Sequence, residues 1–160
     1  MQTFDASSMI YAWDNYPFEQ FPPLWDWMAG LISDGQIVMS SVAFEEVSHK
    51  TPDCCEWLES VGLQRVQVSN DILKEALRIK ALLGIVDEGY HPKGVDEKDL
   101  LIIATAKVNH LPLVSDEEKQ PTKPVELKKY KIPLVCGLNT VNLTCLNYLD
   151  FIKASKTVFG

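Results

Sequence analysis

The stretch from Val95 to Glu118 constrains the fold most, because it joins a long apolar segment to acidic residues at both ends. Apolar residues dominate from Leu100 to Ala106, and the segment from Lys98 to Asn109 contains neither glycine nor proline. This run is too long for a typical strand, so the pattern predicts a helix that is buried on most of its surface. Asp99 then lies in the first turn of that helix.

A short buried strand is expected directly after this helix. Leu113 and Val114 are apolar, follow Pro112, and are followed in turn by Ser115, Asp116 and Glu117. A helix that leads into a strand is half of an α/β unit, and ligand sites in such folds collect beyond the C-terminal ends of the strands. The carboxylates after Val114 therefore stand where a site is expected.

Two other short apolar segments also have an acid and a hydroxyl residue shortly after them. A first strand is expected to end at Asp5, with Ser7 close to the start of the next helix. A second strand covers 37–39, and Ser40 or Ser41 can cap the helix that carries Glu46. Further helices are expected at 9–16, from 22 to near 35, from 52, at 71–85 and at 146–154, with strands at 63–68 and 141–145. The pattern predicts an α/β fold with a parallel sheet.

Length and composition place the chain among globular proteins with one core. A domain of 160 residues buries about 70% of its unfolded surface, so we expect a single domain over 1–160 without disulfide bonds. The cysteines form no Cys-x-x-Cys pair and are expected to be reduced and mostly buried; they are Cys54, Cys55, Cys136 and Cys145. Neither a signal peptide nor a run of about 20 apolar residues is present, so a cytoplasmic protein without membrane contact is expected.

The charge of the chain is unevenly distributed along the sequence. The formal net charge of −7 argues against a protein that binds nucleic acid indiscriminately through a basic surface. One segment of thirteen residues nevertheless carries five lysines and one acid, Glu126, which gives 5 − 1 = +4. These lysines are Lys119, Lys123, Lys128, Lys129 and Lys131. The segment is either a contact for a polyanion or a solvated loop.

The acids at the strand ends suggest a metal site. Asp5, Glu46, Asp99 and one or both of Asp116 and Glu117 recur at strand and helix junctions. Carboxylates that converge in a dry cleft raise one another's pKa, and a divalent cation removes that conflict. Oxygen ligands favour Mg²⁺ or Mn²⁺, which can activate water and stabilise the leaving oxygen of a phosphodiester. The alternative is that each acid only complements a helix dipole, worth about 0.3–1 kcal/mol.

Four segments carry a resemblance to a known family. FDASSMI, SVAFEEV, DLLIIATA and LVSDEE, in this order and at these intervals, resemble the four acidic motifs of PIN-domain ribonucleases, especially the VapC-like toxins of bacterial toxin–antitoxin pairs. The segments FPPLWDWMAGLISDGQIVMSSVAFEEV and KIPLVCGLN also resemble a PIN-like subfamily of small bacterial proteins. The resemblance implies a three-layer PIN-like fold, a short central parallel sheet flanked by helices, and a Mg²⁺- or Mn²⁺-dependent endoribonuclease. It further implies a cognate antitoxin and a homodimer.

The resemblance assigns roles to individual residues. Asp5, Glu46 and Asp99 match the first three acids of the family. The fourth motif is a hydroxyl residue, one spacer and an acid, so Ser115 in the hydroxyl place selects Glu117, whereas aligning aspartate to aspartate selects Asp116. Both alternatives stay open at this point.

Two further roles and one alternative function complete the expectations. Ser7 orients Asp5 or a metal-bound water, or only caps a helix. The RNA backbone is expected to contact the lysine segment through Lys119, Lys123, Lys128 and Lys129. The alternative to a ribonuclease is a PIN-like binding module without catalysis. A phospho-acceptor receiver domain is disfavoured, because its paired acids after the first strand are absent.

Overall fold

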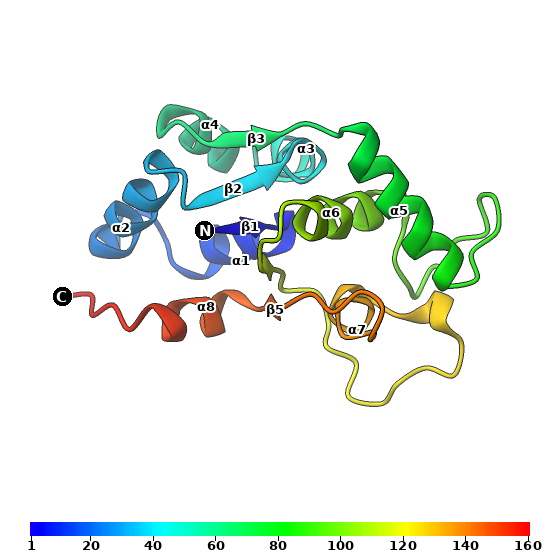
Figure 1. Ribbon diagram of the computed structural model, residues 1–160. Coiled ribbons are helices and arrows are strands. Elements are labelled where there is room, and N and C mark those ends of the chain that lie inside the picture. The colour runs from blue at the N-terminus through cyan, green and yellow to red at the C-terminus, as the bar shows by residue number, and fades with distance from the viewer.

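An all-parallel sheet of five short strands forms the centre of the computed structural model, which describes residues 1–160 (Figure 1). The strands lie in the order β3-β2-β1-β4-β5. Their bounds are Gln2–Phe4 (β1), Ile37–Ser40 (β2), Gln64–Val66 (β3), Leu113–Val114 (β4) and Cys145–Leu146 (β5). The predicted α/β fold, with a short parallel sheet flanked by helices, is confirmed.

Eight α-helices flank this sheet (Figure 1). They are α1 (Ala6–Asn15), α2 (Pro22–Ser33), α3 (Ser41–Lys50), α4 (Pro52–Ser60), α5 (Asn70–Leu82), α6 (Glu97–Val108), α7 (Ile132–Cys136) and α8 (Tyr148–Ser155), with a 3₁₀ turn, η1, at Leu127–Lys129. Ser40 caps α3 and Ser69 caps α5 by accepting backbone N–H bonds. In both cases the cap fixes the start of the helix close to the position that the sequence predicts.

Helix α6 is the most buried helix of the molecule, as the apolar run predicts. Its residues Ile102, Ile103 and Ala104 are fully buried, because α5, α3, α7 and β2 contact it on several sides. Asp96 caps its N-terminus and forms a capping box with Asp99, in which each side chain accepts the backbone N–H of the other residue. The capping box fixes the backbone that presents Asp99 in the first turn.

The C-terminal part of the sheet differs from the prediction. The sequence pattern predicts the last strand at 141–145, but β5 covers only Cys145–Leu146. For the segment from 119 to 133 it predicts a loop with one short turn of helix, whereas the structure has the 3₁₀ turn η1 and the separate helix α7. Residues before β5 form a turn in which the N–H groups of Val141 and Asn142 both bond to the carbonyl oxygen of Leu138. Pairing with β4 therefore decides where β5 begins, and the five residues of α7 are too few to show a helical period.

The structure also bears on the predictions for the cysteines and for membrane segments. All four cysteines are free thiols, and three of them are buried. No helix combines the length and the apolar composition that a membrane span requires. Three of the four tryptophans pack against one another, with ring centroids of Trp25 and Trp57 5.0 Å apart and those of Trp13 and Trp25 5.4 Å apart.

Gly94 is a position where the backbone leaves no room for a side chain. A Cβ atom at Gly94 would collide with the carbonyl oxygen of Lys128, and the next residue, Val95, donates its N–H to the carbonyl oxygen of Tyr130. Gly94→Ala is therefore expected to lower the free energy of unfolding by about 1–3 kcal/mol, as overpacking does. Chemical denaturation measures this loss.

Gly30→Ala is the matched control for that measurement. Gly30 lies inside α2, and a Cβ atom at this position would meet no other atom within 4 Å. Alanine is favoured over glycine by about 0.5–1 kcal/mol at an unstrained helical position. The two substitutions should thus change stability in opposite directions, and equal effects would contradict the steric argument at Gly94.

Candidate active site

Four acids lie at the C-terminal ends of neighbouring strands. Asp5 follows β1 and is only 3% exposed. Glu46 is on α3, which follows β2, Asp99 is in the first turn of α6, and Glu117 follows β4. Figure 1 shows the arrowheads of β1 and β2 directed toward the side of the sheet where α3 and α6 lie. The topology thus gathers residues that are up to 112 positions apart (117 − 5) in the sequence.

A hydrogen-bond network fixes the Asp5 carboxylate. The hydroxyls of Ser7 and Ser115 both donate to Asp5 Oδ2, at 2.6 Å and 3.0 Å. These hydroxyls in turn accept the backbone N–H groups of Asp116 (2.9 Å) and Glu117 (3.3 Å). Because each hydroxyl proton is used on Asp5, both serines hold one carboxylate oxygen in place and connect the end of β1 to the end of β4. Ser7 thus contacts Asp5 rather than capping a helix.

The four carboxyl groups act on one another electrostatically. Burial raises the pKa of Asp5, and the hydrogen bonds from Ser7 and Ser115 partly offset this rise. Burial also raises the pKa of Glu46 and of Glu117, and in both the negative charge of Asp5 is the next cause. The pKa of Asp99 rises to about 8, mainly through burial, which the backbone N–H of Asp96 partly offsets; the charges of Asp96, Asp5 and Glu117 raise it further, in that order. The acids therefore form one cluster, which is hereafter called the acid cluster.

Adjacent residues Asp116 and Glu117 have different surroundings. Asp116 Oδ1 accepts hydrogen bonds from the hydroxyl of Ser8 (2.6 Å) and from the backbone N–H of Tyr148 (2.9 Å). This carboxylate therefore connects α1 to the start of α8. Glu117, in contrast, interacts with Asp5 and Asp99. The structure thus gives Asp116 a structural position and places Glu117 in the acid cluster.

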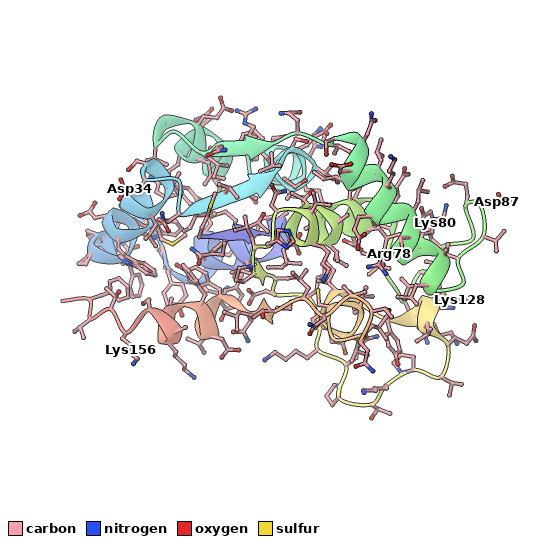
Figure 2. The ribbon with its side chains drawn as sticks, viewed as in Figure 1. Asp34, Arg78, Lys80, Asp87, Lys128 and Lys156 are labelled. Carbon is pink, nitrogen blue, oxygen red and sulfur yellow. The ribbon has the colours of Figure 1, made fainter.

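Most lysines of the basic segment are paired with acids outside the acid cluster. Lys119 Nζ lies 3.5 Å from Asp150, and Lys128 and Lys129 lie 3.3 Å and 3.4 Å from Glu126. Lys123 is exposed and makes no ion pair. Figure 2 shows Lys128 at the rim of the molecule, close to the end of α5.

Other lysines lie beside the acid cluster, and the sequence-based assignment does not include them. Lys50 Nζ is 3.8 Å from Glu46 Oε2 and also lowers the pKa of Glu117. Lys98 likewise lowers the pKa of Glu46, and Lys131 likewise lowers the pKa of Glu117. The spacing of Glu46 and Lys50, one helical turn apart, is the one signal available in the sequence. Lys131 comes close only through the fold.

The acid cluster can be compared with the needs of a divalent cation. Its donors are carboxylate oxygens, which Mg²⁺ and Mn²⁺ prefer, and burial raises the pKa of these groups despite the nearby lysines. No three His, Cys, Asp or Glu side chains stand in the geometry of a ready coordination shell. The chemistry of the donors fits such an ion, and binding it requires the side chains to draw closer together.

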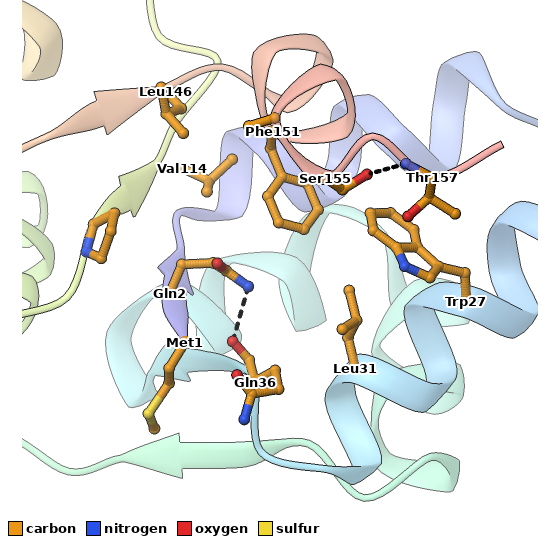
Figure 3. A pocket seen from close by; sticks show the side chains of 12 residues that line it. Met1, Gln2, Trp27, Leu31, Gln36, Val114, Leu146, Phe151, Ser155 and Thr157 are labelled. Carbon is orange, nitrogen blue, oxygen red and sulfur yellow. Dashed lines mark hydrogen bonds between the residues drawn. The ribbon is translucent and has the colours of Figure 1, made fainter.

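A separate cavity of about 380 Å³ lies away from the acid cluster (Figure 3). Met1 and Gln2 at the start of β1, and Pro112 just before β4, are among its lining residues, together with Trp27 and Phe151. None of the acids lines this cavity. It belongs to the N-terminal side of the sheet, opposite to the ends where ligands bind in parallel α/β folds.

Comparisons with known proteins support the fold. The model of the family described as "Domain of unknown function (DUF4411)" matches residues 3–159. A chain of the VapBC2 structure from Rickettsia felis, bound to a DNA fragment from their promoter, is similar with a TM-score of 0.55 and 15% identity. The similarity covers 91% of this chain and 97% of that chain.

A second solved structure is similar as well. A chain of a toxin–antitoxin complex from Klebsiella pneumoniae has a TM-score of 0.49 and 16% identity, over 78% of this chain and 93% of that one. No curated protein matches the sequence. The fold of the protein is PIN-like, and the match over residues 3–159 shows that the chain belongs to the DUF4411 family.

Proposed function

We propose that this protein is a Mg²⁺- or Mn²⁺-dependent endoribonuclease that hydrolyses RNA phosphodiester bonds. The observation that carries the proposal is the coupling of Glu46, Asp99 and Glu117 to Asp5, since burial and the charge of Asp5 raise the pKa of all three. Four buried or half-buried carboxylates at one sheet edge destabilise the protein unless a cation neutralises them. The PIN-like fold supports the proposal, because it supplies the same sheet edge.

In this proposal each residue has a defined part. Asp5, Glu46, Asp99 and Glu117 hold the ion, which would neutralise the phosphate and make bound water more acidic. Ser7 and Ser115 keep Asp5 oriented by their two hydrogen bonds. Lys50 neutralises part of the charge of Glu46 and Glu117 before the ion binds. Asp116 connects α1 to α8 and holds no ion.

We further propose that the protein is the toxin of a toxin–antitoxin pair. The support is the fold shared with a chain of the Rickettsia felis VapBC2 structure. A cognate antitoxin would restrain the activity by covering the acid cluster, and a homodimer and a cytoplasmic location accompany this proposal.

A PIN-like binding module without catalysis is the second candidate. The observation in its favour is that no three acids form a ready coordination shell. The presence of all four acids favours the nuclease. Metal titration separates the two, because a binding module needs no cation whereas the nuclease binds Mn²⁺ through the acid cluster.

The experiment that tests the nuclease is metal-dependent RNA cleavage by the purified protein. A fluorescently labelled single-stranded RNA is incubated with Mg²⁺ or Mn²⁺, with EDTA, and with EDTA followed by excess Mn²⁺. We expect cleavage inside the strand with either metal, none with EDTA, and recovery after re-addition. Cleavage at the same rate in EDTA would contradict the proposal, and so would the absence of Mn²⁺ binding in calorimetry.

A further inference from the structure

A polar hollow of about 580 Å³ lies between the loop before α6 and the loop before α7. None of its lining residues is of a hydrophobic type, in contrast to a typical site for a small organic ligand. The residues that line it are Lys93, Glu118, Gln120, Pro121, Thr122 and Lys131. Two lysines and one carboxylate give it a net positive charge in a protein whose net charge is −7.

The two lysines of the hollow differ from the other lysines of the same region. Lys119, Lys128 and Lys129 each lie within 3.5 Å of a carboxylate oxygen. Lys93 and Lys131 form no such ion pair, so their ammonium groups have hydrogen-bond donors to offer an anion.

The hollow adjoins the acid cluster. Glu118, which lines it, directly follows Glu117 in the chain. The positive charge of Lys131 acts on Glu117 and lowers the pKa of that carboxyl group, against the larger effect of burial. An anion held by Lys131 is therefore a direct neighbour of a molecule that reacts at the acid cluster.

The backbone around Lys131 is held in a specific shape. Gln120 has a φ angle of 52°, in the left-handed region that non-glycine residues rarely adopt. Its side chain accepts the N–H of Lys131 at 2.7 Å and donates to the carbonyl oxygen of Lys129 at 3.0 Å. These two bonds hold the loop at Gln120 against the segment that carries Lys131, so both residues keep their places in the lining of the hollow.

We propose that this hollow binds a backbone phosphate of the RNA strand next to the phosphate that is cleaved, through Lys93 and Lys131. The inference rests on the proposed function, since it takes RNA as the substrate of the acid cluster. Glu118 offsets one of the two positive charges, so a free phosphate ion is expected to bind only weakly in this hollow. An RNA strand is expected to bind more tightly than a free phosphate ion, because its neighbouring phosphate is held at the acid cluster at the same time.

The test is RNA binding by the double variant Lys93→Gln/Lys131→Gln at a fixed concentration of Ca²⁺, an oxygen-ligated cation that suits the acid cluster. Binding is measured by fluorescence anisotropy of a labelled single-stranded RNA, verified by gel to stay intact, across a range of KCl concentrations. We expect binding to weaken by about tenfold or more, and the slope of log K against log[KCl] to fall by about 0.7, since one phosphate contact is lost and each contact contributes about 0.7. The matched control is Lys128→Gln/Lys129→Gln, which removes the same charge from lysines paired with Glu126. This control is expected to change binding less than about threefold, as rim charges do.

Three results would overturn the inference: unchanged binding in the first double variant, an equal loss in the control, or no RNA binding by the unsubstituted protein. Cleavage by the same preparations with Mn²⁺ is scored separately. If the protein binds RNA through Lys93 and Lys131 but never cleaves it, the inference stands and the nuclease proposal fails. If the protein cleaves RNA and the double variant binds as well as the unsubstituted protein, the nuclease proposal stands and the inference fails.

Discussion

Replacing Asp5 by asparagine is expected to reduce Mn²⁺-dependent RNA cleavage by about a thousandfold or more, because the metal ion supplies several kcal/mol of transition-state stabilisation. Asp5 is the most buried acid of the cluster, and its charge raises the pKa of Glu46, Asp99 and Glu117. Asparagine can still accept the bonds from Ser7 and Ser115, so the variant should keep its fold. Single-turnover cleavage rates measure the loss, and thermal unfolding verifies the fold.

Asp116→Asn is the control for this substitution, because it makes the same chemical change at the end of the neighbouring strand β4. Asp116 contacts Ser8 and Tyr148 through one oxygen, which asparagine retains, so cleavage is expected to stay within about threefold. Glu117→Gln, one residue further, is expected to reduce cleavage by about a hundredfold or more. If Asp116→Asn were as inactive as Asp5→Asn while Glu117→Gln stayed active, Asp116 would be the fourth acid.

Asp99→Asn is expected to stabilise the metal-free protein while it removes cleavage. The pKa of Asp99 is about 8 in the folded protein, against 3.8 for the unperturbed group, chiefly because of burial. Between these two values the folded state binds more protons than the unfolded state, so the free energy of unfolding falls as pH rises. The unsubstituted protein is thus most stabilised by this group below about pH 4, and the contribution is lost above about pH 8.

Asparagine resembles the neutral acid and does not titrate, so the free energy of unfolding of the variant does not fall through this position as the pH rises. In EDTA we expect equal stabilities near about pH 4, and an advantage for Asp99→Asn of about 2 kcal/mol at about pH 8, which corresponds to about 4–8 °C in melting temperature. The comparison is made by thermal unfolding at several pH values, with Asp26→Asn on the exposed face of α2 as the control. A difference that shrinks toward higher pH would show that Asp99 is not held at a raised pKa.

Mn²⁺ is expected to reverse this order of stability. Binding of the ion to the acid cluster requires ionised carboxylates and therefore releases protons. Saturating Mn²⁺ should raise the melting temperature of the unsubstituted protein more at about pH 8 than at about pH 6, and that of Asp99→Asn very little. A metal-induced shift of equal size in both proteins would place the ion elsewhere.

The sequence predicted most of the elements correctly where strong local signals were present. The apolar run with Asp99 at its start predicted a helix at 98–109, and α6 covers Glu97–Val108. Proline at 22 and 52 and serine at 40 and 69 marked the starts of four helices. The prediction failed near 141–145, because β5 is defined by pairing with β4 and carries almost no pattern of its own.

The sequence by itself determined the α/β fold and predicted which acids would gather at one edge of the sheet, because periodicity, caps and motif order are local properties that survive without a structure. Only the tertiary structure distinguished the surroundings of Asp116 from those of Glu117, since adjacent residues after a strand face different neighbours, and hydrogen bonds from Ser8 and Tyr148 engage the first of them. It also showed that Lys119, Lys128 and Lys129 are paired with acids, whereas Lys93 and Lys131 are not. Charge pairing depends on distances of a few ångströms between residues far apart in the chain, which no sequence pattern specifies.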